Sequence, residues 1–105
     1  MTEQADFCVG QVVVHELFGY RGVIYEIDPV FMLSTEWYEQ MAKSRPPKNK
    51  PWYQVLVDNA VHTTYVAEQN LRAELEPEPI RHPLLDEIFE CFQEGRYLLR
   101  KDQLQ

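Results

Sequence analysis

Histidine and cysteine are the side chains that most readily bind a metal ion or act as nucleophiles, and this chain has three histidines and two cysteines. Ligands of one metal usually come at short spacings, such as Cys-x-x-Cys. His15, His62 and His82 lie far apart in the sequence, and Cys8 and Cys91 complete no such motif. Neither cysteine stands beside a base in a catalytic motif. The sequence therefore predicts no metal, no cofactor and no nucleophilic catalysis.

Two aspartates, Asp28 and Asp58, each follow a strand-like run. A pair of carboxylates can perform acid–base catalysis when their pKa values are split. Aspartates at strand ends more often accept hydrogen bonds from the backbone of a turn, and we prefer that interpretation. The glycines do not form a phosphate-binding loop. The sequence thus favours a binding protein over an enzyme, with no catalytic residues.

Aromatic and basic side chains gather between Phe31 and Trp52, a stretch that we call the aromatic–basic segment. Its aromatic members include Trp37, Tyr38 and Trp52, and its bases are Lys43, Arg45, Lys48 and Lys50. Such a mixture suits stacking on nucleic-acid bases together with contacts to phosphates. The alternative is that the tryptophans anchor a loop while the lysines only solvate it. Tyr20 and Arg21, in a predicted hairpin turn, extend this candidate binding surface.

A second candidate surface is the tail that follows Gly95. Tyr97, Leu98 and Leu99 precede Arg100 and Lys101. These residues either pack back on the domain or form a short linear segment that another protein recognises. The sequence leaves both alternatives open.

The length and charge of the chain limit its class. With 105 residues it is expected to form one domain, and its formal net charge is −7. An acidic protein approaches nucleic acid against repulsion unless its bases share one face. The sequence shows neither a membrane-spanning run nor a secretory signal, which predicts a cytoplasmic protein with free, buried thiols.

Alternation of apolar and polar residues predicts five strands. Within the first, Val12 and Val14 alternate with Val13 and His15, the pattern of a half-buried strand. Gly19 and Gly22 are expected to supply positive φ in the first hairpin turn. The expected strands are Val9–His15, Arg21–Asp28, Trp52–Asp58, His62–Val66 and Arg72–Leu75.

Helical signals are fewer. Ser34 or Thr35 offers an N-cap for a short helix that ends near Lys43, followed by an irregular, mobile loop. One helical turn is expected at residues 67–71. A longer helix is predicted from Pro83 to Gly95, because an apolar stripe repeats at i, i+3, i+4 and i+7. That stripe consists of Leu85, Ile88, Phe89 and Phe92.

Together these elements predict a mainly β fold, a small SH3-like barrel of about five strands with a short helical insertion and a C-terminal helix. The expected organisation is a flexible N-terminus at residues 1–6 and the barrel at residues 7–75. Residues 76–105 are expected to form an acidic linker, an amphipathic helix and the tail.

Three blocks of the sequence resemble the bacterial HspQ family, also called YccV-like or hemimethylated DNA-binding proteins. They are GQVVVHELFGYRGVIYEIDPV, PWYQVLVDN and TYVAEQNL, which occur in the family's order within residues 7–75. The segment from Ile80 to Tyr97 is more similar to the version at the C-terminus of certain F-box proteins. Shorter bacterial members carry a different tail.

The resemblance implies a cytoplasmic, heat-inducible, self-associating SH3-like protein without catalytic activity. It also implies one of two functions. The first is that of an adaptor that enhances the specificity of a Lon-type ATP-dependent protease toward selected or denatured proteins. The second is preferential binding of hemimethylated DNA, with effects on replication-initiator levels. We favour the adaptor, since an acidic surface does not oppose it, over DNA binding and over a purely structural, self-assembling role.

Overall fold

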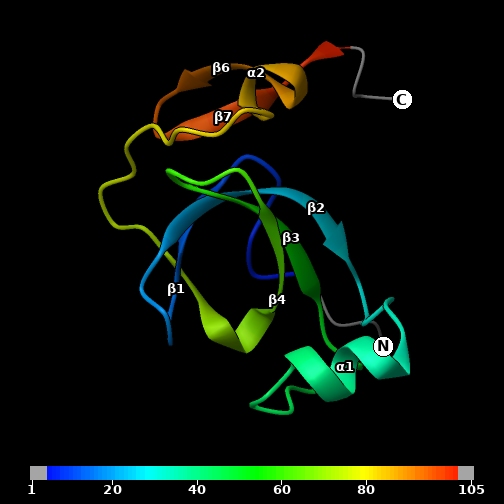
Figure 1. Cartoon of the computed structure of the whole chain (residues 1–105). Coiled ribbons are helices and arrows are strands. Elements are labelled where there is room, and N and C mark those ends of the chain that lie inside the picture. The colour runs from blue at the N-terminus through cyan, green and yellow to red at the C-terminus, as the bar shows by residue number, and fades with distance from the viewer. Residues whose placement is uncertain (1–4, 102–105) are drawn as a thin grey trace.

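The computed structural model describes residues 5–101 (Figure 1). Most of the N-terminal segment that was expected to be flexible, and the end of the tail beyond Lys101, lie outside this range. Between residues 5 and 101, no helix is long and apolar enough to cross a membrane. The elements are β1 (Val12–His15), β2 (Arg21–Asp28), α1 (Thr35–Met41), β3 (Trp52–Val57), β4 (Thr63–Ala67), a 3-10 turn (Glu68–Asn70), β5 (Leu71–Ala73), α2 (Leu85–Ile88), β6 (Phe89–Gln93) and β7 (Arg96–Leu99).

Five antiparallel strands form the main sheet in the order β4-β3-β2-β1-β5. The predicted strands are all present, although β1 begins at Val12 rather than Val9 and β5 covers Leu71–Ala73 rather than Arg72–Leu75. Val12 lies opposite Val23 in the β1–β2 pair, and Trp52 lies opposite Ala67 in the β3–β4 pair. Within the described residues the pairing stops at β4 on one side and at β5 on the other, so the sheet is curved but not a closed barrel (Figure 1).

Strand β1 is buried on both faces, which differs from the half-buried first strand that the alternation predicted. All residues of β1 are buried. Val12 packs against Ile80, Phe89 and other residues of the C-terminal segment, whereas Val13 packs in a separate cluster with Tyr53. The prediction was wrong because a segment distant in the sequence covers the face that was expected to meet water.

The predicted helix from Pro83 to Gly95 is also wrong. Only α2 is helical there, and β6 and β7 form an antiparallel hairpin, which we call the C-terminal hairpin. A register irregularity between Phe89 and Cys91 inserts one residue into β6. Such a bulge turns Phe89 and Phe92 to the same face, where both rings contact Tyr97 with centroids 5.4 and 4.8 Å away. The helical spacing of Phe89 and Phe92 therefore comes from the bulge in β6 and not from a helix.

A backbone contact joins the C-terminal hairpin to the main sheet. The Tyr97 amide donates to the Gly10 carbonyl at 2.8 Å, next to a bridge between Gln11 and Arg96. Gly10 has φ +90, and a Cβ there would lie 2.0 Å from the Tyr97 oxygen. Only glycine permits this approach. The hairpin consequently covers one end of the molecule, with α1 at the other (Figure 1).

The first hairpin differs from expectation at one glycine. Gly19 has φ +74 in the turn, as predicted, whereas Gly22 has no positive φ and lies inside β2. A Cβ at Gly22 would lie 2.5 Å from the Leu56 carbonyl oxygen. Gly22 is therefore required for close packing against β3 rather than for the turn.

Candidate functional site

Helix α1 begins at the predicted cap and holds two pocket residues. The Ser34 hydroxyl accepts a hydrogen bond from the Trp37 amide at 3.0 Å. Trp37 and Met41 lie one turn apart on the helix and line the same pocket. Tyr38, on a neighbouring part of the helix surface, is buried in a cluster with Trp52 and Ala67. The helix is thus anchored through Tyr38 and presents Trp37 and Met41 to the pocket.

Aromatic side chains fix the loop that follows α1. The Tyr38 hydroxyl donates to the Pro46 carbonyl at 2.7 Å, and the Trp52 indole N–H donates to the Pro47 carbonyl at 3.1 Å. Trp52 is 2% exposed. The interpretation of Trp52 as a loop anchor is therefore correct, whereas Trp37 is half-buried and faces the pocket.

Tyr65 of β4 is held in place by Asp28. Its hydroxyl donates to the Asp28 carboxylate at 2.6 Å and accepts from the Met32 amide at 3.1 Å. Burial raises the pKa of Tyr65 above its ordinary value, and the bond to Asp28 raises it further. The Tyr65 ring stacks on Trp52 with centroids 5.2 Å apart. Asp28 therefore orients an aromatic ring at the pocket.

The turn after β1 forms the opposite wall of the pocket. His15 Nδ1 accepts hydrogen bonds from the amides of Leu17 and Phe18, each at 3.1 Å. The imidazole also stacks on the Phe18 ring, with centroids 4.6 Å apart. Burial lowers the pKa of His15, and the nearby Glu16 opposes that effect. A neutral imidazole with Nδ1 as acceptor thus holds the turn that carries Phe18.

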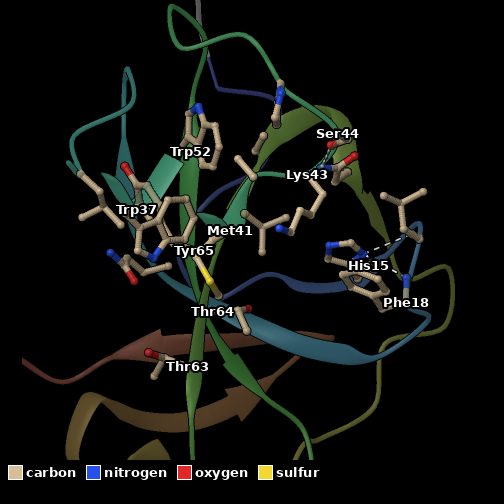
Figure 2. A pocket seen from close by; sticks show the side chains of 18 of the residues that line it. His15, Phe18, Trp37, Met41, Lys43, Ser44, Trp52, Thr63, Thr64 and Tyr65 are labelled. Atoms are coloured by element: carbon tan, nitrogen blue, oxygen red, sulfur yellow. Dashed lines mark hydrogen bonds between the residues drawn. The ribbon is translucent and has the colours of Figure 1, made fainter. Parts of the chain in front are cut away.

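These two walls enclose a pocket of about 400 Å³. Figure 2 shows Trp37, Trp52 and Tyr65 on one side, and His15 and Phe18 on the other. Its floor is formed by β3 and β4, and its lining is mostly apolar. Mostly apolar pockets of this size with a few polar groups are typical of binding sites.

The bases of the aromatic–basic segment do not form one free cationic face. Arg45 Nη1 lies 2.6 Å from a Glu39 carboxylate oxygen. Lys48 Nζ lies 4.3 Å from the centre of the Tyr38 ring. Lys50 is exposed and Lys43 lines the pocket. Arg45 and Lys48 thus interact with the protein's own side chains, which reduces what they can offer to phosphates.

Tyr20 and Arg21 face different surroundings. The Tyr20 hydroxyl bonds with the Thr64 hydroxyl at 2.7 Å, and Tyr20 lines the pocket. Burial raises the pKa of Tyr20. Arg21 belongs to β2 rather than to the turn, and it is not among the pocket residues. Its Nη1 lies 3.0 Å from Asp58 Oδ2, and its Nε lies 3.4 Å from Glu74 Oε2. Asp58 also accepts from the Arg81 amide, 23 residues along the chain, rather than from the backbone of the adjoining turn as expected.

The tail is a strand of the C-terminal hairpin. Tyr97 is 5% exposed, and its hydroxyl accepts from the Ile80 amide at 2.9 Å. Leu99 packs against the same cluster, whereas Leu98 is partly exposed. The Arg100 guanidinium donates to the Asp86 carbonyl, and Lys101 is exposed. Of the two alternatives for this segment, the structure has the packed one.

Neither a metal site nor a disulfide occurs in the described part of the chain. No group of three or more metal-binding side chains is found there. Cys8 and Cys91 are free, as predicted, but Cys8 is only half-buried and Cys91 is exposed. Cys91 lies in β6, on the exposed side of the C-terminal hairpin.

Comparison with protein families identifies the group to which these features belong. The sequence model of the family described as "hemimethylated DNA-binding protein YccV like" matches residues 5–96. The chain belongs to this family. The match includes every residue that lines the pocket and extends through β6 to the first residue of β7. The YccV-like similarity therefore continues beyond residues 7–75, where the three sequence blocks placed it.

The sequence interpretation missed one wall of the pocket. Leu17 and Phe18 were not predicted as binding residues, and they are 62% and 76% exposed. The sequence signal for this wall was the pair of large apolar residues directly before Gly19, because a turn by itself does not require large apolar side chains. Their proximity to Thr64 and Tyr65 depends on the curvature of the sheet, which the sequence does not reveal.

Proposed function

We propose that this YccV-like protein is a non-enzymatic adaptor that binds selected or denatured proteins and promotes their degradation by a Lon-type ATP-dependent protease. The observation that supports this best is the apolar pocket, bordered by exposed Leu17, Phe18 and Met41. Exposed apolar groups around one pocket are characteristic of protein interaction sites. The net charge of −7 does not oppose a protein partner. Cytoplasmic location, self-association and an SH3-like arrangement remain part of this proposal.

The second candidate is binding of hemimethylated DNA, and family membership favours it. Its phosphate contacts would come from the four loop bases, and Arg45 and Lys48 would first have to leave Glu39 and Tyr38. The methyl group of adenine would enter the apolar pocket, since methyl recognition in the major groove requires an apolar contact. Specific sites commonly involve roughly 6–10 phosphates, more than this surface offers.

Two assays on one preparation separate the candidates. For the adaptor, we expect faster degradation of several unfolded substrates by a Lon-type protease when the protein is added. For DNA binding, a GATC duplex methylated on one strand should bind more tightly than the unmethylated duplex. Reversing the charges of the four loop bases should then lower the slope of log K against log salt by about 0.9 for each lost phosphate contact.

A negative result in each assay would refute a different candidate function. No acceleration across several substrates would refute the adaptor proposal, and equal affinity for both duplexes would refute preferential binding of hemimethylated DNA. Removing Arg96–Gln105 is not a clean test of the tail. Such a deletion removes β7 and the buried Tyr97, so it would disturb the fold.

A further inference from the structure

The border of the pocket exposes more apolar surface than its floor. Leu17 is 62% exposed, Phe18 76% and Met41 61%, and all three line the same pocket. Single exposed apolar residues are ordinary, but several around one pocket mark an interaction site. The floor is already packed, since Trp52 and Ala67 are buried. An incoming apolar side chain would therefore contact this border and bury it.

The charge of the pocket is opposite to that of the molecule. The chain has 17 acidic residues, yet no acidic residue between residues 5 and 101 lines the pocket, and Lys43 is the lining residue with a permanent charge. Within the described residues, Lys43 has no carboxylate partner. Figure 2 shows its side chain reaching toward the middle of the pocket. Ser44 and Asn70, 3.4 Å apart between hydroxyl and amide, lie on the same border and add polar groups.

From these features we propose that the pocket selects protein segments in which a large apolar side chain stands next to a carboxylate. The apolar side chain would pack between Phe18 and Met41, and the carboxylate would pair with the Lys43 ammonium. The carboxylate is that of an aspartate, a glutamate or a chain terminus. This inference rests on the proposed function, because it names the class of segment that the adaptor would recognise.

A nucleotide also combines an apolar face with an anion, but the pocket suits it less well. Stacking requires open aromatic faces, but Trp52 is buried against Phe31 and Tyr65, and the exposed Phe18 ring is already stacked on His15. Arg45 and Lys48, which would contact the next phosphates, are held by Glu39 and Tyr38. A peptide needs only one cation and one apolar border. The observations therefore favour a peptide.

Short peptides that differ at one position test the proposal. We would titrate the full chain with peptides that contain Leu-Asp, Leu-Asn or Leu-Lys in an otherwise identical uncharged sequence. Trp37 and Trp52 are the two tryptophans and both line the pocket, so intrinsic fluorescence reports binding. Wild type should bind the Leu-Asp peptide about two- to five-fold more tightly than the Leu-Asn peptide, as expected for one exposed ion pair.

Variants locate the site. Lys43→Glu should reverse the preference, so that the Leu-Lys peptide binds best, whereas Arg81→Glu, an equal charge change at an exposed residue outside the pocket, should keep the wild-type order. Phe18→Ala should weaken binding of every leucine peptide about tenfold. Leu75→Ala is its matched control, since Leu75 is 88% exposed and is not among the pocket residues.

Three results would overturn the proposal. The first is equal affinity of wild type for the Leu-Asp and Leu-Asn peptides, and the second is an unchanged preference in Lys43→Glu. The third is concentration-dependent self-association that Phe18→Ala abolishes, which would assign the border to a second copy of the chain.

The peptide result is distinct from that of the protease assay. Faster proteolysis without peptide discrimination would refute this inference and leave the proposed function standing. Peptide discrimination without faster proteolysis would refute the proposed function and leave the peptide preference of the pocket standing.

Discussion

His15 offers the most informative single perturbation, because it supports the wall of the pocket from within. Its Nδ1 accepts two backbone hydrogen bonds at 3.1 Å, and the residue is 6% exposed. A protein hydrogen bond contributes about 0.5–1.5 kcal/mol net. His15→Ala removes both bonds and should lower the free energy of unfolding by about 2 kcal/mol. His15→Asn, which keeps an acceptor near the position of Nδ1, should recover part of this loss.

The same geometry predicts a pH dependence. Protonation of Nδ1 would abolish the acceptor, and burial lowers the pKa of His15 from its ordinary 6.5. The folded state therefore binds the proton less tightly than the unfolded state does. The stability that neutral His15 provides is complete above pH 6.5 and declines as the pH falls from there toward the lowered value. The difference in unfolding free energy between wild type and His15→Asn should decline over the same range.

Urea unfolding followed by tryptophan fluorescence measures these effects, and His62→Ala is the control. His62 is exposed, and its contact with His82 uses the backbone carbonyl, which alanine retains. Affinity for the Leu-Asp peptide should also fall in His15→Ala, because the Phe18 turn loses its support. The assigned role of His15 is wrong if His15→Ala lowers the free energy of unfolding no more than His62→Ala does. It is also wrong if the stability of His15→Ala declines below pH 6.5 as much as that of wild type.

Other predictions concern the fold that positions the pocket, and urea unfolding measures each of them. Gly10→Ala should lower the free energy of unfolding more than Gly19→Ala does. Both glycines have positive φ, which alone costs about 1–3 kcal/mol for alanine, but only the Cβ at residue 10 would meet the Tyr97 carbonyl. Equal losses would contradict the docking of the C-terminal hairpin at Gly10. Phe89→Ala should cost about 3–5 kcal/mol, since Phe89 is 2% exposed, and Phe18→Ala far less; similar losses would contradict the packing of β6 on the sheet. Tyr65→Phe should cost about 1–3 kcal/mol, because it leaves Asp28 without its hydroxyl donor; an unchanged midpoint would show that this bond does not hold the ring.

Local patterns predicted the main sheet and α1 well, because their signals lie within a few residues. Alternation in Arg21–Asp28 and the cap at Ser34 are examples. The C-terminal hairpin was missed because a bulge in β6 gave Phe89 and Phe92 a helical spacing. The Glu94-Gly95 turn, with φ of 54 and 78, was the signal for a hairpin that the helical stripe obscured.

The candidate site was predicted in part for a similar reason. The aromatic–basic segment does supply Trp37, Lys43 and Trp52 to the pocket. The cationic surface expected there is weaker, because Glu39 pairs with Arg45 only in the folded chain. Phe18 reaches the pocket through long-range contacts of the sheet, which composition and spacing do not encode.

The central claim is that the pocket recruits proteins for degradation. The most direct test is the rate at which a Lon-type protease degrades an unfolded substrate rich in leucine–aspartate pairs, measured with the wild-type protein, Phe18→Ala or Leu75→Ala. Wild type and Leu75→Ala should accelerate degradation to the same extent, and Phe18→Ala should lose most of the effect. Equal acceleration by Phe18→Ala and wild type, or none by any of the three, would contradict the claim.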